Sequence, residues 1–325
     1  MKICVISFDF WHYDAFIVKA LKAQQIDAHH IKIGSVGHAH LGEKVTNAFS
    51  KVVLGKNLKT IKRQQFVINE LKRLGPQDQI LVLNPDVFTA ETLQFIRNKT
   101  KKLITFLYDN LERYPVLDKL HLFDKIYSFE DADIKKHGFE PLTNYNYINF
   151  VDQPKSKKVI HDVFYISSFD KKRIAQSLKL GQKLNSLNKT FRIIISGKKA
   201  WKENLKNKGL NKNSVGKIDF TNHKMCLNEV LDHYQNSTVM VDFMRQNQHG
   251  LSFRVFEAMA LNKKLITDNP LIKNYDFYNP NNILIVDEDL NNLNEEFFTT
   301  PYQNISEEVY NYYTVEHWIK RVFEI

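Results

Sequence analysis

Residues 238–267 read TVMVDFMRQNQHGLSFRVFEAMALNKKLIT and decide the fold. The apolar run 238–242 has the length and β-branched content of a buried strand, and 264–267 has the same character. Between them, 251–261 has the apolar spacing of a helix that begins just after Gly250. A strand, a helix and a second strand in this order form a βαβ unit, so the stretch predicts a parallel sheet.

The start of this helix carries polar groups that suit a phosphorylated ligand. Open parallel sheets bind ligands at the carboxyl ends of their strands, where helix N-termini direct N–H groups at anions. Ser252 offers a hydroxyl there and Arg254 a cation that can pair with a diphosphate. Glu257, three residues after Arg254 on the same helix face, can accept hydrogen bonds from paired hydroxyls. Together, Ser252, Arg254 and Glu257 predict a nucleoside diphosphate sugar as ligand. The alternative is a core helix with Glu257 on its solvent-exposed face.

A resemblance to a known family rests on residues 250–258, which read GLSFRVFEA. The run resembles the donor-binding motif Gly-Leu-(Ser/Thr)-x-Arg-x-Phe-Glu-Ala of GT-B glycosyltransferases that build bacterial polysaccharide and lipopolysaccharide. It is also similar to the Glu-Ala-Met-Ala helix of group 1 glycosyltransferases. The resemblance implies that Glu257 binds the ribose hydroxyls of the nucleotide. Many group 1 members have a second glutamate eight positions earlier, where this chain has His249, so the stereochemistry of transfer stays open.

The resemblance implies a wider donor site in the second half of the chain. In the family, the loop after the first strand of that half lies near the diphosphate, the next strand ends near the nucleotide base, and the loop before the motif faces the transferred sugar. Lys172 lies in the first of these loops and could also neutralise phosphate charge. The predicted donor-binding residues are Ser168, Arg173, Gly197, Gln248, His249, Gly250, Leu251, Ser252, Arg254 and Glu257. The resemblance implies no cofactor beyond the nucleotide sugar itself.

Both halves of the chain alternate short apolar strands with helical patterns. The first half predicts strands at 2–8, 28–33, 79–83, 103–107 and 125–128, with helices at 14–24, 58–74 and 89–98. The second half predicts strands at 162–166, 192–196, 238–242, 264–267 and 283–286, with helices at 171–187, 227–234 and 251–261. We therefore predict an α/β protein with two Rossmann-like, doubly wound domains at 1–152 and 159–304, joined by a polar linker at 152–158. By the resemblance, this is the GT-B plan, and a helix at 305–325 crosses back to the N-terminal domain.

Composition limits the class of protein. The 325 residues, 43% of them hydrophobic, suffice for two globular domains. The two cysteines, Cys4 and Cys226, form no disulfide framework or metal-ligand pair. The apolar stretch at the N-terminus is too short for a signal peptide, and no segment reaches the length that spans a bilayer. These features predict a cytoplasmic protein.

The net charge of +10 favours an acidic partner surface. Between residues 44 and 73, basic side chains alternate with apolar ones at helical spacing, and a second basic group lies between 155 and 173. A basic amphipathic helix suits an anionic membrane surface better than a DNA groove, so we expect peripheral association with the inner face of the plasma membrane and no nucleic-acid partner. The alternative is an ordinary solvated surface.

The first strand leads into a loop that carries Asp9 and His12. Some inverting GT-B enzymes use an Asp or a His as general base on the acceptor side, and a carboxylate beside an imidazole can fix the tautomer of the ring. In the alternative interpretation, Asp9 or Asp14 caps the next helix and His12 is merely exposed. Asp109 follows the strand at 103–107 and is the third catalytic candidate, through contact with the acceptor or the transferred sugar, although it could equally cap a helix or belong to a turn.

A metal site is not expected. Asp131-Ala132-Asp133 resembles the Asp-x-Asp metal motif of a different glycosyltransferase fold, but here it opens a predicted helix, where acidic residues complement the helix dipole. The twelve histidines show no ligand spacing.

Two main functions compete. The first is transfer of a sugar from a nucleotide sugar to a glycan or lipid-linked acceptor in bacterial surface polysaccharide or lipopolysaccharide synthesis. The second is a basic protein that binds nucleic acid or another anionic surface, which accounts for the charge but not for Arg254 and Glu257 on one helix. A nucleotide-sugar epimerase on the same fold is a third possibility, since it needs no acceptor.

Overall fold

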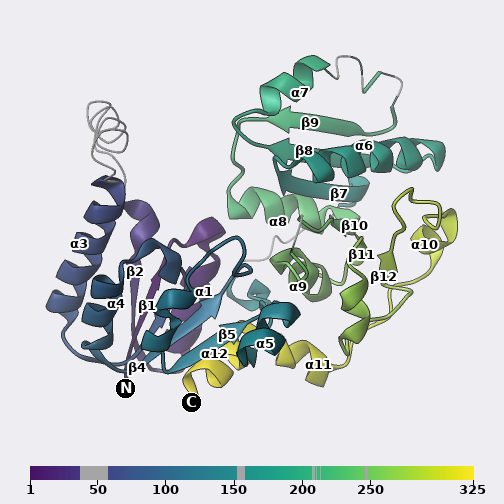
Figure 1. Cartoon of the computed structure of the whole chain (residues 1–325). Coiled ribbons are helices and arrows are strands. Elements are labelled where there is room, and N and C mark those ends of the chain that lie inside the picture. The colour runs from purple at the N-terminus through teal and green to yellow at the C-terminus, as the bar shows by residue number, and fades with distance from the viewer. Residues whose placement is uncertain (37–57, 152–157, 207–208, 210, 213, 246–247) are drawn as a thin grey trace. The chain divides into compact units, whose positions relative to one another are not determined.

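A computed structural model describes residues 1–36, 58–151, 158–206, 209, 211–212, 214–245 and 248–325. The chain divides into two compact units (Figure 1). Unit 1 comprises Met1–Thr143 and Val315–Ile325, and unit 2 comprises Asn144–Thr314. The predicted linker at 152–157 lies outside the described residues, and Asn144–Val151, which we expected at the end of the first domain, belongs to unit 2.

The described part of unit 1 contains a six-stranded parallel sheet in the order β2-β1-β3-β4-β5-β6. Its strands are β1 Lys2–Ser7, β2 Asp27–Lys32, β3 Gln77–Val82, β4 Thr100–Leu107, β5 Lys125–Ser128 and β6 Glu140–Pro141. Its helices are η1 Phe10–His12, α1 Tyr13–Ala23, η2 Ile33–Ser35, α3 Leu58–Leu74, η3 Pro85–Val87, α4 Ala90–Arg97, η4 Leu117–Leu122, α5 Asp131–His137 and α12 Val315–Phe323. The centre of β1 is buried from Ile3 to Ile6, as expected of a strand that helices cover on both faces. The strand order reverses beside β1, which places the ligand-binding end of this sheet at the loop after Ser7.

The described part of unit 2 contains a second six-stranded parallel sheet, in the order β12-β11-β10-β7-β8-β9. Its strands are β7 His161–Ser168, β8 Phe191–Ser196, β9 Lys217–Thr221, β10 Ser237–Asp242, β11 Lys264–Thr267 and β12 Ile283–Ile285. Its helices are η5 Ile148–Phe150, α6 Lys171–Ser186, α7 Ala200–Lys206, α8 Leu227–Gln235, α9 Phe253–Ala260, η6 Pro270–Asn274, α10 Glu295–Thr299 and α11 Glu307–Tyr312. The order reverses between β7 and β10, and the crevice at their carboxyl ends is the expected ligand site of a doubly wound sheet.

The two parallel, helix-flanked sheets confirm the predicted α/β architecture, with one correction at the C-terminus. The expected helix at 305–325 is two helices, α11 and α12, separated at Tyr313 and Thr314. Thr314 forms a bridge with Asn146, and the Tyr313 carbonyl accepts a hydrogen bond from the Asn146 N–H at 2.6 Å, which fixes the chain between the helices. Beyond this break α12 belongs to unit 1, where the Trp318 indole donates to the Thr143 carbonyl at 3.0 Å.

No helix among the described residues is both long and apolar enough to cross a bilayer. Helix α3 begins at Leu58, so the part of the predicted basic region before it lies outside the described residues.

Candidate functional site

Helix α9 begins at the crevice between β7 and β10. Ser252 is its N-cap, with an extended backbone and a side-chain oxygen that accepts from the Arg254 N–H at 3.2 Å. The helix thus begins at Phe253, two residues after the predicted start, and the Ser252 hydroxyl that was predicted to face the ligand caps the helix itself. Gly250 lies in a bend before the helix, and Leu251 is buried there.

The Arg254 side chain contacts the carboxyl ends of both strands. Its Nε and Nη2 atoms each lie 2.9 Å from Asp242 Oδ1 at the end of β10, and Nη1 donates to the Ile166 carbonyl of β7 at 3.0 Å. The side chains of Arg254 and Asp242 are 17% and 6% exposed, and the guanidinium lies over the Tyr165 ring. Burial alone would lower the pKa of Arg254, but the neighbouring Asp242 carboxylate raises it overall. The cation predicted to hold a diphosphate thus forms a buried ion pair that joins β7 to β10.

Glu257 is also in the interior. Its side chain is fully buried, and its Oε1 accepts a hydrogen bond from the hydroxyl of Tyr147, another fully buried residue. The predicted contact of Glu257 with ribose stays a prediction. In the described conformation the carboxylate already accepts a tyrosine hydroxyl, a partner that nothing in the motif announces.

The solvent side of the same crevice carries other cations. Arg245, three residues after β10, donates from Nη2 to the exposed Ser168 hydroxyl at the end of β7, at 3.2 Å. Lys172 in the first turn of α6 is half-exposed and lies 3.5 Å from Asp268. The ends of β7 and β10 are therefore joined twice at the switch point: near the surface by the Ser168–Arg245 hydrogen bond, and in the interior by Arg254. Sequence analysis named Ser168 and Lys172 but missed Arg245, whose only signal was its position just after a strand.

The remaining predicted donor residues are brought to the same edge of the unit 2 sheet but play different parts. Arg173 is buried, and its Nε donates to the Phe243 carbonyl at 3.0 Å. A side chain at Gly197 would meet the Phe169 Cβ at 2.6 Å, so glycine is needed for the loops after β7 and β8 to approach. Gln248 and His249 are held through their backbones. The Gln248 N–H donates to the Arg245 carbonyl, and the His249 carbonyl accepts from the side-chain amide of Asn269.

The loop after β1 in unit 1 has a strained backbone. Asp9, Trp11 and His12 have left-handed φ values of 55°, 58° and 64°. Such conformations cost about 1 kcal/mol or more for each non-glycine residue and gather where a structure needs a particular side-chain direction. The result here is a buried carboxylate beside a 71% exposed imidazole, with His12 Nδ1 3.2 Å from Asp9 Oδ2.

Several groups hold the Asp9 carboxylate in place. It accepts from the Ala15 N–H at 3.0 Å and pairs with the Lys32 ammonium at 2.8 Å. Burial raises the pKa of Asp9, but the hydrogen bond from Lys32 and the charges around it outweigh burial and lower the pKa overall. Asp9 is therefore ionised at neutral pH, and its position on Nδ1 leaves Nε2 of His12 as the basic nitrogen.

Behind this pair lies a second buried carboxyl group. Asp14 accepts from the Tyr108 hydroxyl at 2.8 Å and from the Asp9 N–H at 3.1 Å. Burial raises the pKa of Asp14 to about 6, against the hydrogen bonds from Ser7 and Tyr108. Next to it, His30 contacts the Ser7 hydroxyl at 2.9 Å, and burial lowers its pKa to about 4. Sequence analysis considered Asp14 only as a helix cap.

The contacts described for Asp109 are local ones. Its carboxylate pairs with Arg113, four residues later, at 2.9 Å, and also accepts from the Asn110 N–H. That geometry is a local turn of the kind weighed in the sequence analysis. Its catalytic role stays a prediction.

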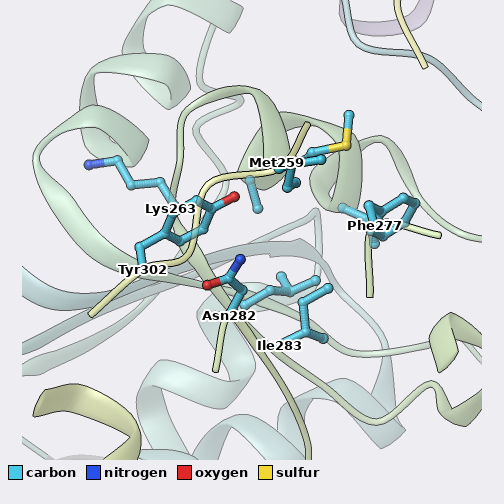
Figure 2. Close-up of a pocket in the computed structure, with 10 residues that line it drawn as sticks. Met259, Lys263, Phe277, Asn282, Ile283 and Tyr302 are labelled. Carbon is cyan, nitrogen blue, oxygen red and sulfur yellow. The ribbon is translucent and has the colours of Figure 1, made fainter. Parts of the chain in front are cut away.

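Among the described residues, no group of three acidic, histidine or cysteine side chains is placed to hold a metal ion. Asp133 of the Asp-x-Asp string instead accepts the Leu111 N–H at 3.0 Å. A small pocket of unit 2, beside the start of β11, has a largely apolar lining (Figure 2). It is lined by Val255, Ala258, Met259, Lys263, Leu265, Phe277, Asn282, Ile283, Tyr302 and Ile305, none of which was predicted as a site residue.

Two Rossmann-like α/β units, with a C-terminal helix that returns to the first, define the GT-B fold, and known structures agree. No protein-family model and no curated protein sequence matches the chain. It is similar to a glycosyltransferase involved in avilamycin A biosynthesis, at 10% identity and a TM-score of 0.59, over 100% of this chain and 96% of that one. A lipopolysaccharide outer core galactosyltransferase is 15% identical, with a TM-score of 0.51 over 100% and 96% of the two chains. The UDP-GlcNAc 2-epimerase of Methanocaldococcus jannaschii is 16% identical, with a TM-score of 0.54 over 100% and 99%.

Proposed function

We propose that this protein is a glycosyltransferase that takes its sugar from a nucleotide sugar. The observation that carries the proposal is the cluster of polar groups at the carboxyl ends of β7 and β10, where Ser168, Arg245 and Lys172 gather and α9 begins. A hydroxyl, two cations and a helix N-terminus at the switch point of a doubly wound sheet suit a diphosphate. Its charge grows as the sugar leaves, so cations fixed there would lower the barrier to transfer.

On the acceptor side, the proposal uses His12. Its imidazole is exposed, and the buried Asp9 carboxylate on Nδ1 orients it. An Nε2 nitrogen so oriented can take the proton of an acceptor hydroxyl as that hydroxyl attacks the anomeric carbon. This role applies if transfer inverts the configuration of the sugar. Retention would require another mechanism, and the described residues present no obvious nucleophile for it.

The proposed acceptor is a glycan or lipid-linked sugar of bacterial surface polysaccharide or lipopolysaccharide synthesis. It is supported by the resemblance of residues 250–258 and by one structural neighbour that is a lipopolysaccharide outer core galactosyltransferase. Peripheral binding to an anionic membrane is a further part of the proposal, supported by Lys59 and Lys62 in the first turns of α3 and by the net charge of +10. A neutral vesicle should then bind less protein than one rich in phosphatidylserine, and the difference should vanish at high salt.

A second candidate is epimerisation of the nucleotide sugar. One structural neighbour is a UDP-GlcNAc 2-epimerase that was solved with UDP-GlcNAc and UDP. The two activities separate by product, because an epimerase converts its nucleotide sugar without any acceptor. Conversion of the intact donor to an isomer, with no nucleotide released, would replace transfer by epimerisation.

The test is thermal stabilisation by the diphosphates of the five common nucleosides and their common sugar conjugates. A ligand that binds only the folded state raises the melting temperature by mass action. Lys172→Gln should weaken the shift, whereas Lys179→Gln, on the same helix but paired with Asp289 at the surface, should leave it unchanged. No shift with any nucleotide at millimolar concentration would reject the proposal and return a basic anion-binding surface to first place.

A further inference from the structure

The chain passes between the two units twice, and both passages contact helix α9. The units change over at Thr143–Asn144 and at Thr314–Val315. The first residues of unit 2 after one passage, Asn144–Ile148, lie beside the last residues before the other, since Asn146 forms a bridge with Thr314. We call Asn144–Ile148 the strap.

Contacts from the strap cover the start of α9. The Asn144 amide donates to the Leu251 carbonyl at 2.8 Å, just before the helix. The Tyr145 and Tyr147 rings pack against Phe253, in its first turn, with centroids 5.1 and 6.4 Å away. From the other passage, the Tyr313 ring lies 5.6 Å from the next aromatic residue of the helix, Phe256. The position of α9 thus depends on both passages of the chain.

The Tyr147–Glu257 hydrogen bond is the polar centre of this contact. Both side chains are fully buried, so neither reaches solvent in the described conformation. A buried carboxylate is costly unless hydrogen bonds compensate its lost hydration, and the Tyr147 hydroxyl provides one. A ribose hydroxyl could reach Glu257 only if the strap moved away.

We infer that Tyr147 and Glu257 are a positioning pair, which fixes α9 and the Gly250–Ser252 loop to the strap, and that Glu257 supports a bound nucleotide through α9 without touching its ribose. The inference rests on the proposed function for the identity of the ligand, although the pair itself is independent of it. It differs from the role that the family resemblance implies for Glu257. A ribose contact and a positioning pair predict different responses to the same substitutions.

The first experiment tests the pair without ligand. Tyr147→Phe keeps the ring but removes the hydroxyl, and should lower the melting temperature of the full chain by about 5 °C. In a Glu257→Leu background the same change should shift it by less than about 1 °C, because the partner is already gone. Tyr127→Phe is the control, since its hydroxyl donates to the Arg321 carbonyl within unit 1 and its effect should be the same in both backgrounds. Equal effects of Tyr147→Phe in both backgrounds would overturn the pair.

The second experiment separates positioning from a ribose contact. The probe is the nucleoside diphosphate that stabilises the protein most, compared with its 2′,3′-dideoxy form. Tyr147→Phe and Glu257→Leu should each raise Kd about tenfold for both forms, and Glu257→Gln, which can still accept the tyrosine hydroxyl, should restore binding to within about threefold of wild type. The ratio of the two Kd values should stay the same in all variants. A ratio that falls to about one in Glu257→Leu and falls partway in Glu257→Gln, whose neutral amide oxygen accepts more weakly, but not in Tyr147→Phe would show a ribose contact and overturn the inference.

A failure of the proposed function can be distinguished from a failure of the positioning pair. If no nucleoside diphosphate binds, the proposed function fails, while the melting temperatures of the first experiment still decide whether the pair exists. If Glu257→Leu does not fold, Tyr147→Phe and Glu257→Gln still decide the ribose contact, because both substitutions preserve packing.

Discussion

Removal of the Arg254 side chain should destabilise unit 2 severely, although the motif places this residue at a ligand site. Arg254→Ala removes three contacts, to Asp242 Oδ1 from two nitrogens and to the Ile166 carbonyl. It leaves the Asp242 carboxylate 6% exposed and without its cation. Breaking a buried ion pair from one side costs about 3–5 kcal/mol, a large part of the 5–15 kcal/mol that stabilises a typical protein. At about 2–4 °C per kcal/mol, the melting temperature should fall by roughly 6–20 °C.

The assay is urea denaturation of wild type, Arg254→Ala and the double variant Arg254→Met with Asp242→Leu. The double variant removes both charges and fills the space with apolar groups, so it should recover most of the lost stability. A dependence on the partner of this kind is the signature of a buried pair. The reasoning is refuted if Arg254→Ala stays within about 1 kcal/mol of wild type while nucleotide binding disappears, since that is the behaviour of a cation reserved for ligand.

Three further substitutions test the proposed donor site of unit 2 and the loop after β1 in unit 1. Arg245→Gln should raise the Kd of the bound nucleoside diphosphate about tenfold and leave the melting temperature of the free protein unchanged; an unaltered Kd would exclude Arg245 from the site. His12→Gln should lower the rate of sugar transfer by about 10²-fold or more without affecting donor binding, whereas His29→Gln, at a half-exposed histidine of the same unit, should change neither the rate nor donor binding; normal transfer by His12→Gln would remove His12 as the base. The pKa of Asp14 is higher in the folded protein, about 6, than the ordinary 3.8, so this carboxyl group favours folding below pH 4 and loses that contribution as pH rises through 6. Asp14→Asn should therefore gain up to about 3 kcal/mol of stability relative to wild type between pH 4 and pH 8, measured by urea denaturation, and a difference independent of pH would contradict the raised pKa.

Much of the fold could be predicted from sequence because burial on both faces leaves a direct pattern. The centres of strands such as β1 and β10 are apolar, and the apolar spacing of residues 251–261 predicts a helix close to the observed α9. The C-terminal helix was harder, because its break at Tyr313 and Thr314 contains neither glycine nor proline. That break depends on Asn146, more than 160 residues earlier, and no local signal encodes a contact over such a separation.

The site residues also divide into those that sequence could identify and those that it could not. Asp9 and His12 could be found from sequence because both follow a strand, and the structure does bring them together. What sequence could not supply was the support behind them, since Lys32 and Tyr108 reach this loop from the ends of other strands. Parallel sheets collect such groups from distant parts of the chain at one edge, so a local motif identifies the edge but not its full composition.

The two cations after β10 show why residue type and spacing alone could not assign roles. Arg254 fits the motif, yet Asp242, twelve residues earlier, neutralises it inside the sheet. Arg245 fits no motif, yet the strand carries it to the surface of the same crevice, where it meets Ser168 of β7. A cation already paired with a buried carboxylate must give up that pair before it binds phosphate, and separating two buried charges costs more than rearranging a hydrogen bond to an exposed serine hydroxyl. The cost of desolvation therefore assigns the internal connection between strands to Arg254 and favours Arg245 for the ligand, and that cost depends on a burial that only the folded chain determines.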